Sequence, residues 1–485
     1  MVDPSVDFAS AGALVADLTE RRISAAELTE HAIARIERLD GSLNAVVVRD
    51  FDHARTAARE ADAALVRGER KPLLGVPITI KESYDIAGLP KTWGMPWFKD
   101  WRSETDAVAV ARLKAAGAIV LGKTNVPFAL ADWQSYNDVY GTTNNPWALD
   151  RTPGGSSGGS AVSVAAGYVP LEMGSDIGGS LRAPAHYCGV YSHKPSRGVV
   201  PGRGQVPPGV FGGTPDLPVI GPLARNVADL ELAFGLVAGP DIIEAAGTRI
   251  ALPPPRHERM REYRVLVLDT HPLLEADRAM RAALERLAHR IRAQGAYVAT
   301  ESPLVPDLVA LGRAFAGLLM PVISARLPAE RLAEMTAEAS AFSPDDDTPA
   351  AWVARACVAT HREWLVADAA RVRAAYRWHE LFREFDVVLF PPMPTPAFFQ
   401  DQSEIRNRTI DIDGTPHPYN DQMFYASLAT APGLPATTAP IERSETGLPI
   451  GVQIIGPFLE DHTTLRFAGL LEEAFGGFTP PPEYA

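Results

Sequence analysis

Apolar residues in the first part of the chain follow two alternating patterns. Two helices open it, and the second begins at a capping box of Ser24 and Glu27, behind which apolar residues recur at helical spacing. Short apolar runs bounded by polar or turn residues come between further helical stretches. The pattern predicts strands at 44–49, 74–81 and 118–122, with helices at 52–67 and 105–116 between them. Strands that alternate with helices are typical of an α/β sheet.

Between residues 141 and 221 the chain is dense in glycine, serine and proline, and the apolar patterns shorten. We expect a short helix at 160–166, a strand at 169–173 and a long ordered loop over 199–222. A proline-rich surface excursion at 241–264 follows. The later expected elements are strands at 264–269, 296–300, 386–390, 435–439 and 450–455, and helices at 225–238, 277–293, 306–338, 350–384 and 463–474. Because no repeat or clean boundary divides the chain, we favour one large domain with helical excursions.

The composition of the 485-residue chain is that of a folded globular protein, with 46% hydrophobic and 22% charged residues. Its net charge is −13, and an acidic chain without a basic tract is a poor binder of nucleic acid or of an anionic membrane surface. The N-terminal residues do not resemble a secretory signal, and no apolar run reaches the ~18 residues of a membrane span. We therefore expect a cytoplasmic protein that has neither nucleic acid nor membrane as a partner.

Cys188 and Cys357 are the only cysteines, too few for a disulfide framework or a CxxC zinc motif. We interpret both as buried thiols in a reducing compartment. His186 and His193 flank Cys188, but their spacing is not a standard zinc pattern. The sequence therefore predicts neither a metal nor a cofactor.

The tract most suggestive of chemistry is TPGGSSGGSA at 152–161, followed by GSDIGGSLR at 174–182. Glycines let backbone amides converge on one point, which stabilises charge on a phosphate or on a reacting carbonyl oxygen. A phosphate cradle fits poorly, because no Lys-Ser/Thr pair follows and GxGxxG is absent. A flexible linker also fits poorly, because a helix and a strand flank the tract directly. The patterns Gly154-x-Ser156-x-Gly158 and Gly155-x-Ser157-x-Gly159 both match a nucleophile elbow, which would require an acid and a histidine elsewhere.

Three ordered segments together resemble the amidase signature family. They are GVPITIKE around Lys81, PGGSSGGSA at 153–161 and GSDIGGSLR at 174–182, with 24 residues between Ser156 and Ser180. The segments LARNVADL (223–230), FDVVLFPPMPTPA (385–397) and GLPIGVQIIG (447–456) extend the likeness.

The resemblance implies a single α/β/α domain over residues 1–485. Its central mixed, twisted sheet would have about eleven strands, with helices on both faces. The catalytic core would span about 70–230 and about 385–475. The stretch at about 240–380, where the likeness is weakest, would form a helical excursion.

By the same resemblance Ser180 is the nucleophile, Ser156 a bridging serine and Lys81 the base. A serine hydroxyl attacks a carbonyl well only when a base takes its proton, and a lysine can do so only as the neutral amine. Burial disfavours the ammonium form, and the apolar strand that ends at Lys81 allows such burial. The strand alone would favour an ordinary lysine with its head in water, and only the two serine segments reverse this interpretation.

The backbone amides of Ile177, Gly178, Gly179 and Ser180 would form the oxyanion hole of this mechanism. In the family the bond before the bridging serine is cis, which here is Gly155–Ser156. The other residues that the resemblance assigns to supporting the turn are Ser157, Asp176 and Arg182.

The residues that face the substrate are less clearly marked. Trp133 and Tyr136 would lie near the acyl pocket, although both could equally be core aromatics. Phe211 in the proline-rich loop could form a wall of the entrance. We expect an amidase that cleaves the C–N bond of an aromatic or aliphatic amide through a seryl acyl-enzyme. Esters and carbamates (urethanes) stay open as substrates, because their carbonyls would fit the same oxyanion hole.

Two other functions compete with a stand-alone amidase. The amidase subunit of a tRNA-dependent amidotransferase would share the three segments but require partner subunits. A binding protein on an inactive scaffold would not need Lys81, Ser156 and Ser180 together, so their joint presence argues against it. A homodimer is plausible for the family, but no interface is visible in the sequence.

Overall fold

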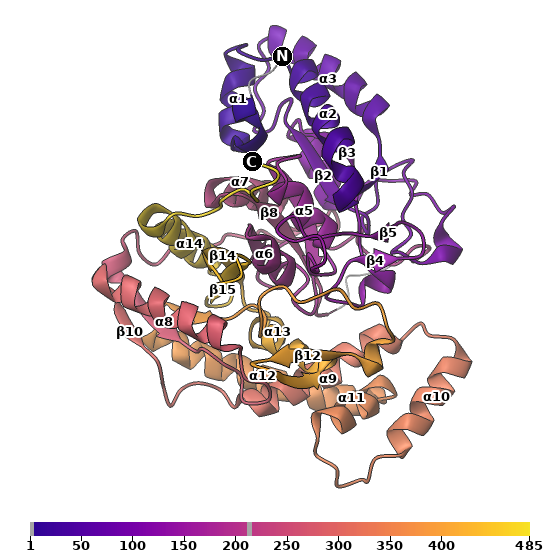
Figure 1. The fold of residues 1–485 in the computed structure, drawn as a ribbon, viewed down its shortest axis with the longest axis vertical. Coiled ribbons are helices and arrows are strands. Elements are labelled where there is room, and N and C mark those ends of the chain that lie inside the picture. The colour runs from indigo at the N-terminus through magenta and orange to yellow at the C-terminus, as the bar shows by residue number, and fades with distance from the viewer. Residues whose placement is uncertain (1–3, 211–215) are drawn as a thin grey trace.

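A computed structural model describes residues 4–210 and 216–485, and one eleven-stranded sheet runs through it (Figure 1). The neighbours β3–β2–β6 and β11–β9–β10 are parallel, and the remaining neighbours are antiparallel, so the sheet is mixed as predicted. In spatial order the strands are β1 (Val46–Arg49), β3 (Ile119–Thr124), β2 (Pro77–Lys81), β6 (Leu171–Asp176), β8 (Val219–Ala224), β7 (Tyr191–Lys194), β14 (Ala436–Arg443), β15 (Pro449–Ile455), β11 (Val387–Phe390), β9 (Arg264–Val267) and β10 (Tyr297–Ala299).

Helices cover both faces of this sheet. On one face Thr79 of β2 meets Ser163 of α5, with 3.0 Å between the hydroxyl oxygens. On the other, His193 of β7 lies 3.1 Å from the carboxylate of Asp461 in α14. The helices are α1 (Ala11–Thr19), α2 (Ala25–Leu43), α3 (Phe51–Val66), α4 (Val108–Ala115), α5 (Gly158–Ala165), α6 (Arg182–Cys188), α7 (Val227–Val237), α8 (Arg278–Ala293), α9 (Leu308–Ser324), α10 (Ala329–Ser340), α11 (Pro349–Cys357), α12 (His361–Glu384), α13 (Met423–Thr430) and α14 (Asp461–Phe475).

Helix α5 explains part of the glycine and serine density near residue 158. All eight of its residues are buried. A Cβ on Gly159 would lie only 2.4 Å from the backbone nitrogen of Asn125, which follows β3. Small residues therefore let this helix lie almost directly on the sheet, which brings the turn before it close to the end of β2.

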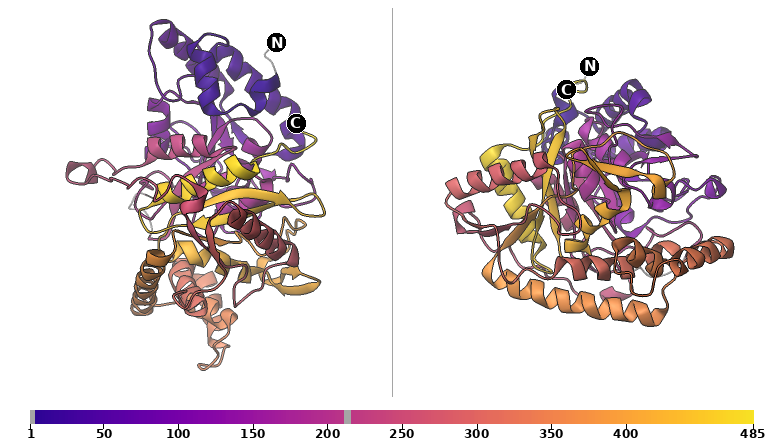
Figure 2. Two further views of the ribbon diagram at one scale, coloured as in Figure 1. Left: turned by 90° about the vertical axis from the view of Figure 1, so that its left-hand side faces the viewer. Right: turned by 60° about the horizontal axis from the view of Figure 1, so that its bottom comes forward.

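Helices α9 to α12 lie at the end of the molecule away from α1 to α3 (Figures 1 and 2). The first part of the stretch predicted as a helical excursion at about 240–380 instead contributes β9 and β10 to the central sheet. The single helical stretch predicted at 306–338 is two helices, and Pro328 caps the second. The stretch predicted at 350–384 is also two, and Thr360 accepts a hydrogen bond from the backbone of Glu363 at the start of α12.

Most of the elements predicted from longer patterns are confirmed, including the capping box of Ser24 and Glu27. The prediction of a loop throughout 199–222 was wrong, because β8 begins at Val219 and continues through Gly221 and Pro222. The helices α6 and α13 and the strand β7 were not predicted. Two small hairpins were also not predicted, one of β12 (Thr409–Ile412) with β13 (Thr415–Pro418) and one of β4 (Tyr136–Asn137) with β5 (Gly141–Thr142).

Short segments give few periods from which to recognise a pattern, and glycine and proline hide a buried strand such as β8. Within the ranges 4–210 and 216–485, no helix combines the length and the apolar character needed to cross a membrane.

Candidate active site

Lys81 ends β2 and meets three serines, two from the turn before α5 and one from β6. Its ammonium nitrogen donates hydrogen bonds to the hydroxyl oxygens of Ser156 at 2.8 Å, Ser157 at 2.9 Å and Ser175 at 2.9 Å. We call Lys81, Ser156, Ser157 and Ser175 the lysine–serine cluster. Lys81 is completely buried. The structure thus brings three predicted site residues together, Lys81, Ser156 and Ser157.

The position of Lys81 follows from its strand. All five residues of β2 are buried, because β3 and β6 flank it and α5 covers it. Burial lowers the pKa of Lys81 to about 7, although the carboxylates of Asp176 and Glu172 act in the opposite direction. A lysine with a pKa near neutrality is a neutral amine in a large fraction of molecules at physiological pH, so it can accept a proton.

The turn that carries Ser156 has the predicted cis peptide bond between Gly155 and Ser156. There is no room for a larger residue at Gly155, where a Cβ would lie 2.3 Å from the carbonyl oxygen of Asp132 and 2.5 Å from that of Gln134. Ser135 fixes the turn from the side, because its hydroxyl donates to the carbonyl of Gly154 at 2.9 Å. The glycines therefore serve close approach of backbone segments.

Asp176 organises the second loop, between β6 and α6. Its carboxylate accepts hydrogen bonds from the amides of Gly179 (2.9 Å) and Leu181 (3.0 Å) and from two guanidinium nitrogens of Arg182 (2.9 and 3.0 Å). Burial alone would raise the pKa of Asp176, but the charge and hydrogen bonds of Arg182 lower it to about 2. Asp176 is therefore a permanent anion at the centre of this turn.

Ser180 lies in this turn, and 5% of its surface is exposed. Within the described ranges its hydroxyl has no hydrogen bond to Ser156 or Lys81, so the structure does not close the chain of contacts from Lys81 to Ser180. The amide of Gly179, one of the four assigned to the oxyanion hole, donates to Asp176. In the same ranges the amides of Ile177, Gly178 and Ser180 have no hydrogen-bond acceptor in the protein.

Trp133 borders the turn of Ser180. Its indole nitrogen donates to the carbonyl oxygen of Gly178 at 2.8 Å. A Cβ built on Gly179 would have Ala426, Trp133 and Met393 as its nearest neighbours, at 3.6 to 4.0 Å. These three side chains mark the apolar surroundings of the turn.

Tyr136 is linked to Trp133 through a buried ion pair. Arg408 donates to the carboxylate of Asp132 at 2.6 Å and to the hydroxyl of Tyr136. Tyr419 donates to the same carboxylate at 2.6 Å, and its ring meets the Trp133 ring edge-on at 5.6 Å. Phe211, the third residue predicted for the pocket, lies outside the described residues.

Sequence reasoning missed Ser175, which contacts Lys81, and Gln205, which contacts Ser175. The side-chain amide of Gln205 donates to the hydroxyl of Ser175 at 3.1 Å and to that of Ser83 at 3.2 Å. Ser175 stands within the segment GSDIGGSLR, which was assigned to the site from the sequence, but its hydrogen bond with Lys81 was not predicted. No sequence signal pointed to Gln205 or to the Asp132–Arg408 ion pair.

The histidines next to Cys188 have structural partners. His186 lies 3.0 Å from the carbonyl of Thr395 and accepts from the amide of Gly451 at 2.8 Å, and burial lowers its pKa to about 4. Cys188 is buried, and Cys357 is partly buried. In the part of the chain that the structure describes, no group of three or more His, Cys, Asp or Glu residues could hold a metal ion.

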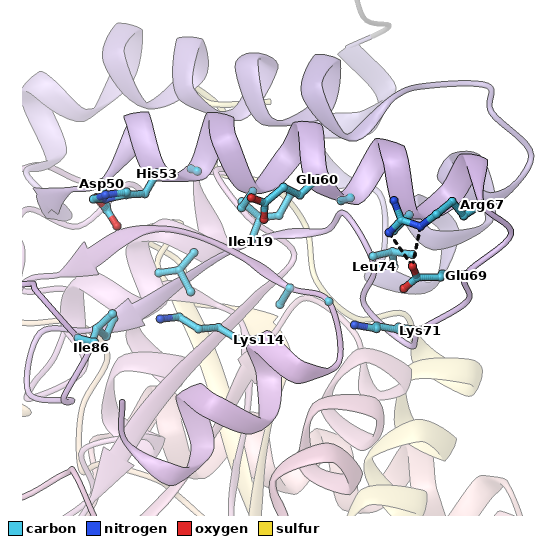
Figure 3. Close-up of a pocket in the computed structure, with 18 residues that line it drawn as sticks. Asp50, His53, Glu60, Arg67, Glu69, Lys71, Leu74, Ile86, Lys114 and Ile119 are labelled. Carbon is cyan, nitrogen blue, oxygen red and sulfur yellow. Dashed lines mark hydrogen bonds and ion pairs between the residues drawn. The ribbon is translucent and has the colours of Figure 1, made fainter. Parts of the chain in front are cut away.

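A separate groove of about 550 Å³ lies between α3 and the segment from α4 into β3 (Figure 3). Several of its charged residues pair with each other or with a neighbour, such as His53 with Asp50 at 2.6 Å and Arg67 with Glu69 at 2.7 Å. None of the residues that line it belongs to the lysine–serine cluster or to the turn of Ser180. This groove is therefore distinct from the candidate active site.

Comparison with known proteins places the chain among enzymes. The sequence profile of the family described as Amidase matches residues 27–465. Indoleacetamide hydrolase of Bradyrhizobium diazoefficiens is 34% identical over 94% of this chain and 84% of its own. A glutamyl-tRNA(Gln) amidotransferase subunit of Anaeromyxobacter sp. (strain K) is 33% identical over 96% of both chains. The crystal structure of a bacterial aryl acylamidase superposes with a TM-score of 0.81 at 25% identity, covering 97% of each chain.

The fold and the match over nearly the whole chain thus define a hydrolase of C–N amide bonds. The chain belongs to the amidase signature family.

Proposed function

We propose that this protein is a stand-alone amidase in which Ser180 is the nucleophile, Ser156 relays a proton and Lys81 is the base. The observation that carries the proposal is the contact between the buried Lys81 nitrogen and the Ser156 hydroxyl, at 2.8 Å. A charged lysine that is fully buried and forms no ion pair within the described ranges destabilises the fold. Such burial is typical of a lysine whose neutral amine takes part in catalysis.

In the proposed reaction the Ser180 oxygen attacks the amide carbonyl carbon. The Ser180 proton passes to the Ser156 oxygen, and the Ser156 proton passes to the neutral Lys81 nitrogen. The carbonyl oxygen becomes an oxyanion beside the amides of Ile177, Gly178 and Ser180, while Gly179 holds the turn through Asp176. The contact between Ser180 and Ser156 would form in the complex with substrate, since hydrogen bonds at active sites often tighten only when substrate binds.

Breakdown of the tetrahedral intermediate uses the same groups in reverse. Lys81 returns its proton through Ser156 to the leaving nitrogen, the C–N bond breaks, and the acyl group stays on the Ser180 oxygen as an ester. Water then attacks the carbonyl carbon of this ester, and the water proton passes through Ser156 to Lys81. Lys81 returns that proton through Ser156 to the Ser180 oxygen as the bond between Ser180 and the acyl group breaks. The carboxylic acid and the amine are the products.

The substrate that this site favours is an amide with an aromatic or aliphatic acyl group. Trp133, Met393 and Ala426 surround the turn of Ser180 with apolar surface, and Tyr419 extends it. Relatives named for aryl acylamides and for indoleacetamide support this class. Carbamates and esters would present the same carbonyl to the same amides, so the proposal includes them as slower or alternative substrates.

A component of a tRNA-dependent amidotransferase is the second candidate. The 33% identity to such a component over 96% of both chains favours it as strongly as the other relatives favour an amidase. The two candidates differ in one property, because a stand-alone amidase hydrolyses simple amides without partners. Hydrolysis of an aryl amide by the purified chain therefore separates them.

The mechanism is tested by labelling the purified chain with a fluorophosphonate and mapping the labelled peptide. We expect the adduct on Ser180, absent in Ser180→Ala and strongly reduced in Lys81→Met. An adduct on Ser156 or Ser157 would instead support a nucleophile elbow and overturn the assignment. Ser163→Ala is a matched control, because Ser163 is a buried serine of α5 that contacts Thr79 and not Lys81.

A further inference from the structure

Glu172 places a carboxyl group beside Lys81, although it belongs to a different strand. Glu172 lies on β6 opposite Thr79 of β2, and Thr124 of β3 lies opposite Lys81. The Thr124 hydroxyl donates to one carboxyl oxygen of Glu172 at 2.6 Å. Because β2 lies between β6 and β3, the Glu172 side chain must cross over β2 between Thr79 and Lys81 to reach Thr124.

This carboxyl group is almost completely enclosed, with 1% of the residue exposed. Its second oxygen has no hydrogen-bond partner among residues 4–210 and 216–485. Helix α5 covers it with hydroxyl groups, since the Ser160 oxygen lies 3.0 Å from that of Thr124. On β8, its partner in register is Leu223.

Few charged or titratable groups of the described chain face Glu172. Lys81 and Tyr84 act on it from β2 and the residues that follow, and the Tyr84 hydroxyl donates to the carbonyl of Gly174. On its own strand Asp176 is neutralised by Arg182 of α6. From β3 and α5 the hydroxyls of Thr124 and Ser160 approach it. Lys81 is therefore the cation to which the charge of Glu172 is coupled.

A lone carboxylate in a dry interior is costly, so Glu172 holds its proton more strongly than an ordinary glutamate. Burial raises the pKa of Glu172 to about 8, close to the value of about 7 for Lys81. Two neighbouring groups that titrate in the same range share their protons, and the charge of each affects the other.

We propose that Glu172 is a positioning residue whose carboxyl group forms a proton-sharing pair with Lys81 and so sets the pH at which Lys81 becomes a neutral amine. The inference rests on the proposed role of Lys81 as base. With Glu172 protonated, the neutral Lys81 is free to take the proton from Ser156. With Glu172 ionised, its negative charge holds the proton on Lys81.

The first test is the pH profile of kcat/KM for Glu172→Gln, which keeps the shape of the side chain without its charge. The acid limb should move to lower pH, because in the wild type some of the molecules with one shared proton keep it on Lys81 with Glu172 ionised, and a Gln at this position cannot take that form. Glu172→Leu should move it in the same direction if Gln misfolds. The matched control is Glu472→Gln, a partly buried glutamate of α14 that accepts a hydrogen bond from Val227 and should leave the limb in place.

The second test does not depend on activity. Infrared difference spectra of wild type against Glu172→Gln should show the band of a protonated carboxylic acid that disappears as the pH rises. In Lys81→Met the band should disappear at a higher pH than in wild type. This shift should equal the shift of the acid limb in Glu172→Gln, because coupling between two sites is reciprocal. A residue with a purely structural role would change stability and move neither midpoint.

The outcomes separate this inference from the proposed function. If Ser180 is labelled as expected but neither midpoint moves, the coupling of Glu172 to Lys81 is overturned and the mechanism stands. If the fluorophosphonate labels Ser180 in Lys81→Met as strongly as in wild type, the proposed mechanism fails. Equal shifts in the two pH tests would then show that Glu172 and Lys81 share a proton without a role in catalysis.

Discussion

The nitrogen of Lys81 lies 2.8 Å from the hydroxyl oxygen of Ser156, although 75 residues separate them in sequence. An ammonium group has three N–H bonds, and all three find a serine oxygen here. When the amine is neutral, one of these hydroxyls must turn and donate to its lone pair. Ser157 already donates to the carbonyl of Ser175 at 3.2 Å, whereas the proton of Ser156 has no acceptor in the described residues.

The rate should therefore depend on the protonation of Lys81. Its pKa of about 7 lies below that of an ordinary lysine because of burial, so the neutral base is lost as the pH falls through about 7. We expect kcat/KM to fall by about tenfold for each pH unit below that value and to level off above it. A profile that rises only in the pH range of an exposed lysine would contradict the assignment.

Replacing the base should abolish most of the activity. Lys81→Met should lower kcat by roughly 10²–10⁴-fold, the usual contribution of a general base, with the fold retained by circular dichroism. Lys123→Met is the matched control, since Lys123 is equally buried but donates to the carbonyl of Pro90. Equal losses in both variants would show that burial of a lysine, and not its chemistry, matters.

Ser175 should matter to turnover although it is outside the proposed relay. It accepts hydrogen bonds from Lys81 and Gln205, and a bond to a charged group is worth about 1.5–3 kcal/mol. Ser175→Ala should lower kcat by about tenfold or more while KM changes little. Steady-state kinetics beside Ser163→Ala would check this, and the expectation is wrong if KM rises instead of kcat falling.

Asp176 should stabilise the fold as well as the turn. Asp176→Asn leaves the buried Arg182 guanidinium without its carboxylate, which should cost about 3–5 kcal/mol of unfolding free energy. Because its pKa is about 2, below that of an ordinary Asp, the stabilisation is present above the unfolded-state pKa and is lost as the pH falls toward about 2. Urea unfolding at several pH values measures both effects, with Asp345→Asn at an exposed position as the control. If Asp176→Asn lost as much unfolding free energy toward acid pH as the wild type does, the ionisation of Asp176 would not be the cause.

Trp133 should affect both turnover and binding of the acyl group, and two different substitutions separate these effects. Trp133→Phe keeps an aromatic ring but removes the 2.8 Å hydrogen bond to Gly178, so kcat should fall by a similar factor for all substrates. Trp133→Ala should in addition raise KM for amides with aromatic acyl groups and leave KM for acetyl amides nearly unchanged. Comparison of the two substrate series measures this, and equal KM changes in both would exclude Trp133 from the acyl pocket.

The sequence by itself determined the elements whose signals are local. The capping box of Ser24 and Glu27 and the apolar strand that ends at Lys81 depend on neighbouring residues, so they were readable without the fold. The spacing of the segments around Lys81, Ser156 and Ser180 also pointed to a family before any contact was known.

Only the tertiary structure decided which groups meet. The strand β8 is hidden by Gly221 and Pro222 and is a strand because β6 and β7 pair with both of its edges. Ser175 contacts Lys81, and Glu172 reaches Thr124 across β2, because three strands from distant segments lie side by side. Burial and the charges of Asp176 and Glu172 set the pKa of Lys81, and a linear pattern records neither.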